Sequence, residues 1–162
     1  TRHDAAAEKS AAAISALAQE HGFTVATAES LTGGQIATTL AAAKDSSEWF
    51  AGSVVSYQTR VKYEVLGVPD GQPVITETAV RAMAEGVAEL MGADAAVAVS
   101  GCGGPGEQEN QPPGTTWIAA RVRGTTHTEL NHFTGDTEEI LAQSRRRCLD
   151  MLLSLMRETV LT

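Results

Sequence analysis

The chain is poor in the residues that mark several common protein classes. Phe, Trp and Tyr make up only 4% of its 162 residues, which leaves few rings for stacking on nucleic-acid bases. Basic residues are also scarce, because 12 Lys and Arg stand against 20 Asp and Glu and the formal net charge is −8. Nucleic-acid binding depends on positive charge that follows the phosphates, so we expect no nucleic-acid partner.

Cysteines and long apolar runs are scarce as well. Cys102 and Cys148 lie far apart and form no CxxC pair, which argues against a disulfide framework or a zinc site and fits a reducing cytosol. No apolar run approaches the ~18 residues of a transmembrane helix. The polar, Ala-rich stretch 1–13 does not resemble a signal peptide. We therefore expect a cytoplasmic protein without a membrane partner.

What the sequence does contain is Ala and Val in short blocks separated by glycine. Hydrophobic residues amount to 43%, and no linker or repeat divides the chain, so we expect residues 1–162 to form a single domain. Apolar blocks predict strands at 23–26, 52–57, 93–100, 115–122 and 126–133. Helical spacing and capping residues predict helices at 4–21, 35–43, 59–66 and 77–91, and a last helix that begins at Asp136.

This order of elements predicts an α/β fold. Strands that alternate with helices form a mainly parallel sheet covered on both faces, and the last two strands form an antiparallel hairpin. Within the helices, we expect Val61, Val65 and Leu66 to face inward, and Leu90 and Met91 to belong to the buried face of helix 77–91.

The stretch Thr27–Gly34 (TAESLTGG) lies between a predicted strand and a predicted helix. Its glycines allow the backbone to approach a ligand closely. The N–H groups around Thr32–Gly34 favour negative charge, either a bound anion or a developing oxyanion. Ser30 would lie at the mouth of this site. The alternative is a simple helix N-cap, because Ser and Thr oxygens accept main-chain N–H groups there.

A second glycine-rich loop, 101–106, follows another predicted strand, and Tyr57 ends a third. Since the carboxyl ends of parallel strands share one edge of a sheet, we expect these segments to meet Ser30 there. Lys62 could take the proton of the Ser30 hydroxyl if burial lowers its pKa. Tyr57 could orient the lysine or relay the proton. Taken singly, a lysine such as Lys62 is more often a solvated helix residue, and a tyrosine such as Tyr57 is more often a half-buried strand residue.

Other candidates carry weaker signals. Cys102 could be a thiol nucleophile, but no His or Asn is placed to activate it. Glu29 could be a general base, could bind a ribose hydroxyl, or could be a polar residue at a strand end. His127 and His132 fall on opposite faces of a strand, and no carboxylates have metal-ligand spacing, so we expect no metal. Residues 145–147 (RRR) read as a solvated helix face, with a dimer contact or an anion contact as alternatives.

Together, the motifs resemble one family over nearly the whole chain, from about Leu17 to the last helix. The matching segments are 27–34 (TAESLTGG), 46–50 (SSEWF), 52–57 (GSVVSY) with Lys62, 67–68 (GV), 100–105 (SGCGGP), 113–117 (PGTTW) and 133–136 (FTGD). Their order and spacing are similar to those of the bacterial nicotinamide-nucleotide amidases, the C-terminal domain of CinA proteins. The resemblance implies a three-layer α/β/α sandwich with a mixed sheet, assembled as a homodimer.

The resemblance also implies a reaction. It is the hydrolysis of the carboxamide of nicotinamide mononucleotide to nicotinate mononucleotide and ammonia, without a metal or cofactor. Ser30 is then the nucleophile, Lys62 its general base and Tyr57 an assisting group. The implied substrate-binding residues come from the two glycine loops and the strand that follows: Glu29, Thr32, Gly33, Gly34, Ser100, Gly101, Gly104 and Thr115.

Several positions depart from the family pattern. Leu31 replaces the usual Cys after the serine, and Thr137, Leu141 and Ala142 stand where the family has arginines. These departures keep two further hypotheses open. One is a nucleotide-binding module that does not catalyse, and the other is an amidase acting on a different substrate.

Overall fold

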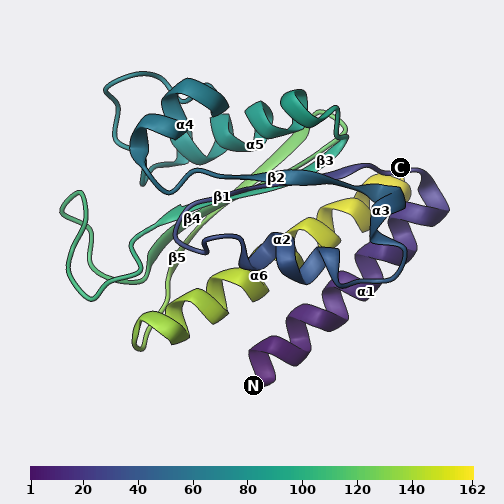
Figure 1. Ribbon diagram of the computed structural model, residues 1–162, viewed down its shortest axis with the longest axis horizontal. Helices are drawn as coiled ribbons and strands as arrows, with labels where there is room; N and C mark the ends of the chain where they lie inside the picture. The colour runs from purple at the N-terminus through teal and green to yellow at the C-terminus, as the bar shows by residue number, and fades with distance from the viewer.

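The computed structural model describes residues 1–162, which fold into six helices and five strands (Figure 1). In chain order these elements are α1 (Arg2–His21), β1 (Val25–Glu29), α2 (Gln35–Ala41), α3 (Ser46–Trp49), β2 (Phe50–Val55), α4 (Thr59–Leu66), α5 (Glu77–Met91), β3 (Ala95–Gly101), β4 (Thr115–Val122), β5 (Thr125–His132) and α6 (Thr137–Val160).

The strands form one mixed sheet in the order β2-β1-β3-β4-β5. β1 pairs in parallel with β2 and with β3, whereas β4 pairs antiparallel with β3 and with β5. The predicted mixed sheet and terminal hairpin are therefore confirmed. Because β1 lies between two parallel neighbours, the loops after β1, β2 and β3 leave the sheet at the same edge.

Helices cover both faces of the sheet and create two separate cores (Figure 1). One core packs α1, α2 and α6 against one face, and the other packs α4 and α5 against the opposite face. β3 supplies both, since Val97 and Val99 enter the first core while Ala96 and Ala98 enter the second. This alternation is the period of a strand buried on both sides, and it confirms the three-layer α/β/α arrangement.

Two strands differ most from the sequence prediction in their boundaries. β2 ends at Val55, so Ser56 and Tyr57 follow the strand in which they were predicted to lie. The larger difference is in β1. The strand begins at Val25 and runs on through Glu29, so part of the predicted loop is strand. Parallel pairing of Glu29 with Val55 and a 2.7 Å hydrogen bond from Thr27 Oγ1 to Ser53 Oγ extend the strand beyond its apolar block. Pairing with neighbours thus outweighs local residue preference.

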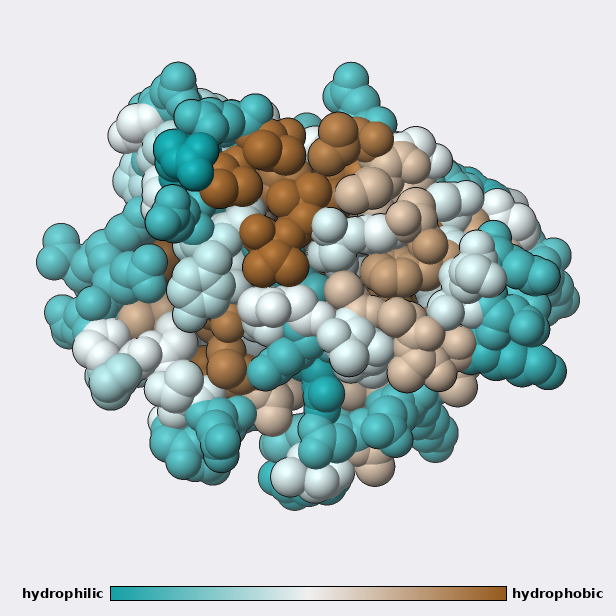
Figure 2. All heavy atoms as spheres, in the orientation of Figure 1, coloured by the Kyte–Doolittle hydropathy of each residue, from teal (hydrophilic) through white to brown (hydrophobic).

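Two predictions of inward-facing residues were wrong. Val65 of α4 and Leu90 of α5 are 45% and 56% exposed, and Val55 of the edge strand β2 is also exposed. Figure 2 shows apolar side chains gathered over β2 and the helices above it. The residue that α4 buries instead is Lys62, with 2% of its surface exposed.

The longest helix, α6, begins where the sequence predicted. Asp136 is its N-cap, and Asp136 and Glu139 form a reciprocal capping box, which satisfies two main-chain N–H groups that helix geometry leaves free. None of the helices combines the length and the apolar character that a bilayer crossing requires.

Candidate active site

A pocket of about 330 Å³ opens at the sheet edge where β1 and β3 end. This volume lies within the range of small-molecule sites, about 300–1,000 Å³. Its walls come from the loops after β1, β2 and β3 and from the start of α6. The lining residues are Ser30, Leu31, Tyr57, Gly101, Cys102, Gly103, Gly104, Gly106, Glu107, Gln108, Thr137 and Leu141.

Ser30 lies in a tight turn directly after β1. Gly33 N donates to Ser30 O at 3.0 Å, and Gly33 and Gly34 have φ angles of 57° and 104°. These left-handed values suit glycine and would strain other residues. The turn leaves Ser30 only 8% exposed while its side chain still lines the pocket. A hydroxyl held in this way by the backbone can be presented to a ligand in a fixed position.

Glu29, immediately before Ser30, is fully buried and serves the start of α2. Its Oε1 accepts from Thr32 Oγ1 at 2.7 Å, from Gly34 N at 3.1 Å and from Ile36 N at 3.0 Å. Its Oε2 accepts from Ala37 N at 2.8 Å. The start of α2 favours a nearby negative charge, and the carboxylate of Glu29 supplies it.

This arrangement changes which N–H groups can face a ligand. Gly33 N and Gly34 N are engaged with Ser30 O and Glu29, so they are not free oxyanion donors. The main-chain N–H groups of Leu31 and Thr32 have no acceptor within the chain. Leu31 also lines the pocket, whereas Thr32 does not, so the Leu31 N–H is the candidate donor beside Ser30.

Lys62 lies beneath the same sheet edge. Its Nζ donates to Ser56 O at 2.5 Å, and Ser56 donates to Glu29 O through its main-chain N at 2.7 Å and through its hydroxyl at 3.0 Å. Burial lowers the pKa of Lys62 to about 8, although the negative charge of Glu109 opposes the fall. The lysine is therefore a base with a pKa close to neutrality, linked through Ser56 to the residue that precedes Ser30.

The second glycine-rich loop is held in place by hydrogen bonds to its surroundings. Ser100 Oγ donates to Val74 O at 2.6 Å, and the Glu109 carboxylate accepts from Val74 N at 2.9 Å and from Ile75 N at 2.9 Å. Cys102 is 1% exposed, and its Sγ donates to Gly106 O at 3.2 Å. The loop is thus tied to the segment before α5, which fixes one wall of the pocket.

The structure brings together some of the predicted site residues and separates others. Ser30, Tyr57, Gly101 and Gly104 line the pocket, and Tyr57 is 70% exposed there. The remaining predicted polar side chains are buried behind the walls, and none of them lines the pocket; they are Glu29, Thr32, Lys62, Ser100 and Thr115. Thr115 Oγ1 donates to Pro112 O at 2.8 Å.

Gly33 and Gly34 face elsewhere. They line a separate pocket of about 620 Å³ between α1 and α2, where Arg145 also lies. All three consecutive arginines make ion pairs instead of forming a merely solvated face: Arg145 pairs with Asp4, Arg146 with Asp150 and Arg147 with Glu129.

Sequence reasoning missed two pocket residues, Glu107 and Gln108. Both follow the glycines of the second loop directly, and the polar run there was the signal that could have drawn attention to them. Thr137 and Leu141, singled out for departing from the family pattern, do lie in the pocket wall.

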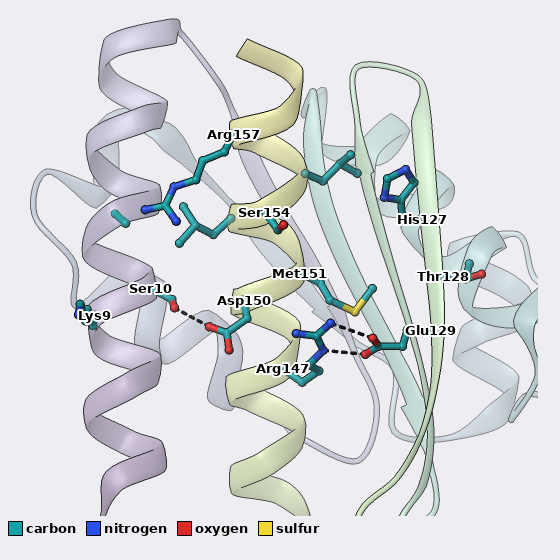
Figure 3. A pocket seen from close by; sticks show the side chains of 13 residues that line it. Lys9, Ser10, His127, Thr128, Glu129, Arg147, Asp150, Met151, Ser154 and Arg157 are labelled. Carbon is teal, nitrogen blue, oxygen red and sulfur yellow. Dashed lines mark hydrogen bonds and ion pairs between the residues drawn. The ribbon is translucent and has the colours of Figure 1, made fainter. Parts of the chain in front are cut away.

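The largest pocket lies away from both glycine loops. It measures about 640 Å³ and lies between α1, α6 and β5 (Figure 3). Arg147 and Glu129 point toward each other there and make two hydrogen bonds of 2.7 and 2.8 Å, and Ser10 donates to Asp150 at 2.6 Å (Figure 3). These four side chains are therefore paired within the pocket, and no residue of the Ser30 loop lines it. The smaller pocket at Ser30 is the candidate active site.

Comparison with known proteins adds to this geometry. Residues 7–156 match the model of the CinA C-terminal domain. Protein YdeJ of Escherichia coli K12 is 36% identical over 80% of this chain and 78% of its own length. A nicotinamide-nucleotide amidohydrolase, PncC, of Pseudomonas putida is 40% identical over 83% of this chain and 87% of its own length.

Longer relatives and solved structures agree with these matches. A CinA-like protein of Akkermansia muciniphila is 40% identical over 93% of this chain, which spans only 38% of that protein. The crystal structure of a CinA superfamily protein from Klebsiella pneumoniae 700603 superposes with a TM-score of 0.89 at 32% identity, covering 94% of this chain and 98% of that one. The expected fold and family are therefore confirmed.

Proposed function

We propose that this chain, which belongs to the CinA C-terminal domain family, hydrolyses the carboxamide of nicotinamide mononucleotide or of a closely related pyridinium compound and releases ammonia. The similarity to the nicotinamide-nucleotide amidohydrolase PncC of Pseudomonas putida supports an amidohydrolase. The observation that carries the proposal is local: Ser30 lines a pocket, and a buried lysine whose pKa is about 8 lies beneath the same sheet edge.

In the proposed reaction, the Ser30 hydroxyl oxygen attacks the carboxamide carbon while its proton passes to neutral Lys62. The N–H group of Leu31, which lines the pocket beside Ser30, stabilises the resulting oxyanion. The C–N bond then breaks, and the proton held by Lys62 leaves with ammonia. Water, deprotonated by Lys62, attacks the acyl-Ser30 ester, which releases the carboxylic acid and restores the serine hydroxyl.

The remaining predicted residues take supporting places in this scheme. Tyr57, which is largely exposed beside Ser30, would assist proton transfer or cover the bound ring. Gly101 and Gly104 also line the pocket. Gly104, with a φ of 80°, would let the backbone approach the substrate closely, whereas the space beside the Cα of Gly101 is filled by Thr115 and Thr116. Glu29 and Thr32 would act indirectly, by holding the loop that carries Ser30.

The direct test measures ammonia release from nicotinamide mononucleotide by the protein and by Ser30→Ala. We expect the variant to lose activity by about 10³-fold or more, as happens when a nucleophile is removed. Ser47→Ala, an exposed serine on α3, is the matched control and should keep the full rate. Equal rates for Ser30→Ala and the parent protein would rule out the proposed nucleophile.

One observation favours a second candidate, a nucleotide-binding module without catalysis. Lys62 Nζ donates to the main chain of Ser56, and no hydrogen bond joins it to the Ser30 hydroxyl. Calorimetry that detects nucleotide binding without ammonia release would support this module. Turnover that depends on Ser30 would exclude it.

The homodimer implied by the resemblance also stays a prediction. The exposed apolar side chains Val55, Val65 and Leu90 lie on neighbouring elements, and such surfaces are frequent at protein interfaces. Sedimentation velocity would give the assembly directly.

A further inference from the structure

We infer that Glu109 is a positioning residue for the reaction at Ser30, because its carboxylate is fixed near the buried Lys62 and serves as the counter-charge of that lysine. This inference rests on the proposed amidase function and adds a residue to it. Glu109 does not line the pocket, so it acts on the reaction through Lys62.

Glu109 occupies the tip of a tight turn in the second glycine-rich loop. Gln108 and Gln111 exchange main-chain hydrogen bonds of 3.1 and 2.9 Å, and the two residues between them, Glu109 and Asn110, have φ angles of 53° and 60°. Positive φ at both central positions is the pattern of a type I′ turn, which favours Asn and Gly. A glutamate is unfavourable at such a position, and this points to a use for its side chain.

The Glu109 carboxylate is held by main-chain groups of another segment. It accepts from Val74 N at 2.9 Å and from Ile75 N at 2.9 Å, and both of these residues are buried. Ser100 Oγ, near the end of β3, donates to Val74 O at 2.6 Å, so Glu109 is connected to the end of that strand. Val74 and Leu66 of α4 belong to the same core, which places the carboxylate on the side of the sheet that α4 covers.

Lys62 is attached to the neighbouring part of the same sheet edge. Its Nζ donates to the main-chain oxygen of Ser56, directly after β2. Only β1 lies between β2 and β3, and adjacent strands are about 4.8 Å apart, so the ends of β2 and β3 are roughly 10 Å apart. Burial lowers the pKa of Lys62, and the negative charge of Glu109 raises it.

No other charge takes this place beside Lys62. Glu29, the other acid at this edge, binds the start of α2 through its carboxylate. The remaining titratable groups of α4, α5 and the nearby loops are exposed or engaged with other partners; they are Arg60 with Glu64, Arg81 with Glu77, Glu85 with Arg121, Tyr63 with Gln72, and the exposed Tyr57, Asp70, Glu89 and Glu107. A protonated lysine that is buried without a counter-charge is strongly disfavoured. Glu109 therefore allows Lys62 to hold the serine proton until it leaves with ammonia.

The test measures the pH dependence of kcat for ammonia release from nicotinamide mononucleotide by the parent protein and by Glu109→Gln. Gln removes the charge but keeps an oxygen that can accept from Val74 N. We expect the midpoint of the pH–rate profile to fall by about 0.5–1 pH unit, because an opposite charge nearby favours the protonated lysine. Glu64→Gln removes the same charge from the exposed face of α4 and should keep the midpoint of the parent protein.

The possible outcomes separate this inference from the proposed function. A lower rate at every pH with an unchanged midpoint would show that Glu109 only supports the loop. Equal shifts in Glu109→Gln and Glu64→Gln would show that Glu109 is no specific counter-charge. Either result would overturn the inference and leave the amidase intact.

If the parent protein releases no ammonia, the amidase proposal fails, and urea unfolding at pH 7 and pH 9.5 still decides whether Glu109 is the counter-charge of Lys62. The pKa of Lys62 falls from 10.5 on folding, so the free energy of unfolding rises with pH in this range. Without the counter-charge the fall in pKa is larger, and the rise should be larger in Glu109→Gln than in the parent protein and in Glu64→Gln. An equal rise in all three proteins would refute the inference.

Discussion

Raising the pH from 7 to 9 should increase the rate of carboxamide hydrolysis about tenfold if Lys62 is the general base. Only the neutral amine can accept the Ser30 proton, and burial lowers the pKa of Lys62 to about 8. The neutral fraction is then about 0.1 at pH 7 and about 0.9 at pH 9. An unperturbed lysine would be almost fully protonated across this range.

The same pKa makes a prediction about stability. The pKa of Lys62 falls from 10.5 to about 8 on folding, so between these values the unfolded chain binds more protons, and the free energy of unfolding rises with pH. Below pH 8 both states are protonated, and burying the charged lysine costs roughly 3 kcal/mol, from 2.5 pKa units at about 1.36 kcal/mol each.

The Lys62→Met variant tests the effect of Lys62 on the rate and its effect on stability separately. Removing the charge recovers that cost, while Ser56 O loses its Lys62 donor at a cost of about 1–3 kcal/mol. The variant should therefore be as stable as the parent protein at pH 7, or slightly more stable, and inactive at every pH. Urea unfolding gives the first quantity, and ammonia release between pH 6 and 10, with Ser30→Ala subtracted as background, gives the second.

Two results would refute this reasoning. A rate that stays flat between pH 7 and 9 would show that no group with a pKa near 8 controls proton transfer. Activity retained by Lys62→Met would show that another residue is the base.

Two further predictions concern the scaffold around the site. Glu29→Gln should lower the free energy of unfolding by about 2 kcal/mol or more, because the amide nitrogen of Gln would face a main-chain N–H group whose hydrogen bond the Glu29 carboxylate accepts in the parent protein. The control is Glu20→Gln at an exposed position. Equal urea midpoints for the two variants would contradict the capping role of Glu29. Gly86→Ala should destabilise the protein by about 1–3 kcal/mol despite the better helix propensity of Ala, because the added Cβ would clash with Leu66 O. Thermal unfolding measures the change in stability. A stabilised variant would contradict the close packing of α5 on α4.

Much of the fold could be predicted from the sequence because the relevant signals are local. The alternation of the Ala and Val block became β3, and the box of Asp136 and Glu139 began α6. The exposed faces of Val65 and Leu90 were not predictable in this way, since apolar spacing cannot tell which side of a helix has a neighbour.

The convergence of the loops on one pocket was predictable for the same reason. The loops converge because parallel strands end at one edge, which placed Ser30, Tyr57 and Gly101 around one pocket. The partners of Glu29 and Glu109 could not be predicted, because both carboxylates bind main-chain groups whose positions depend on the folded turns. The burial of Lys62 likewise depends on neighbours contributed by distant segments.

The carboxylate of Glu29 has a consequence for how a ligand would be received. The helix start beside Ser30 already holds an anion that belongs to the chain, bound by Gly34, Ile36 and Ala37. The loop therefore takes its shape during folding, with Glu29 as its permanent internal ligand, and needs no substrate to order it. An incoming amide binds a loop that is already ordered, so none of its binding free energy is lost to ordering that loop.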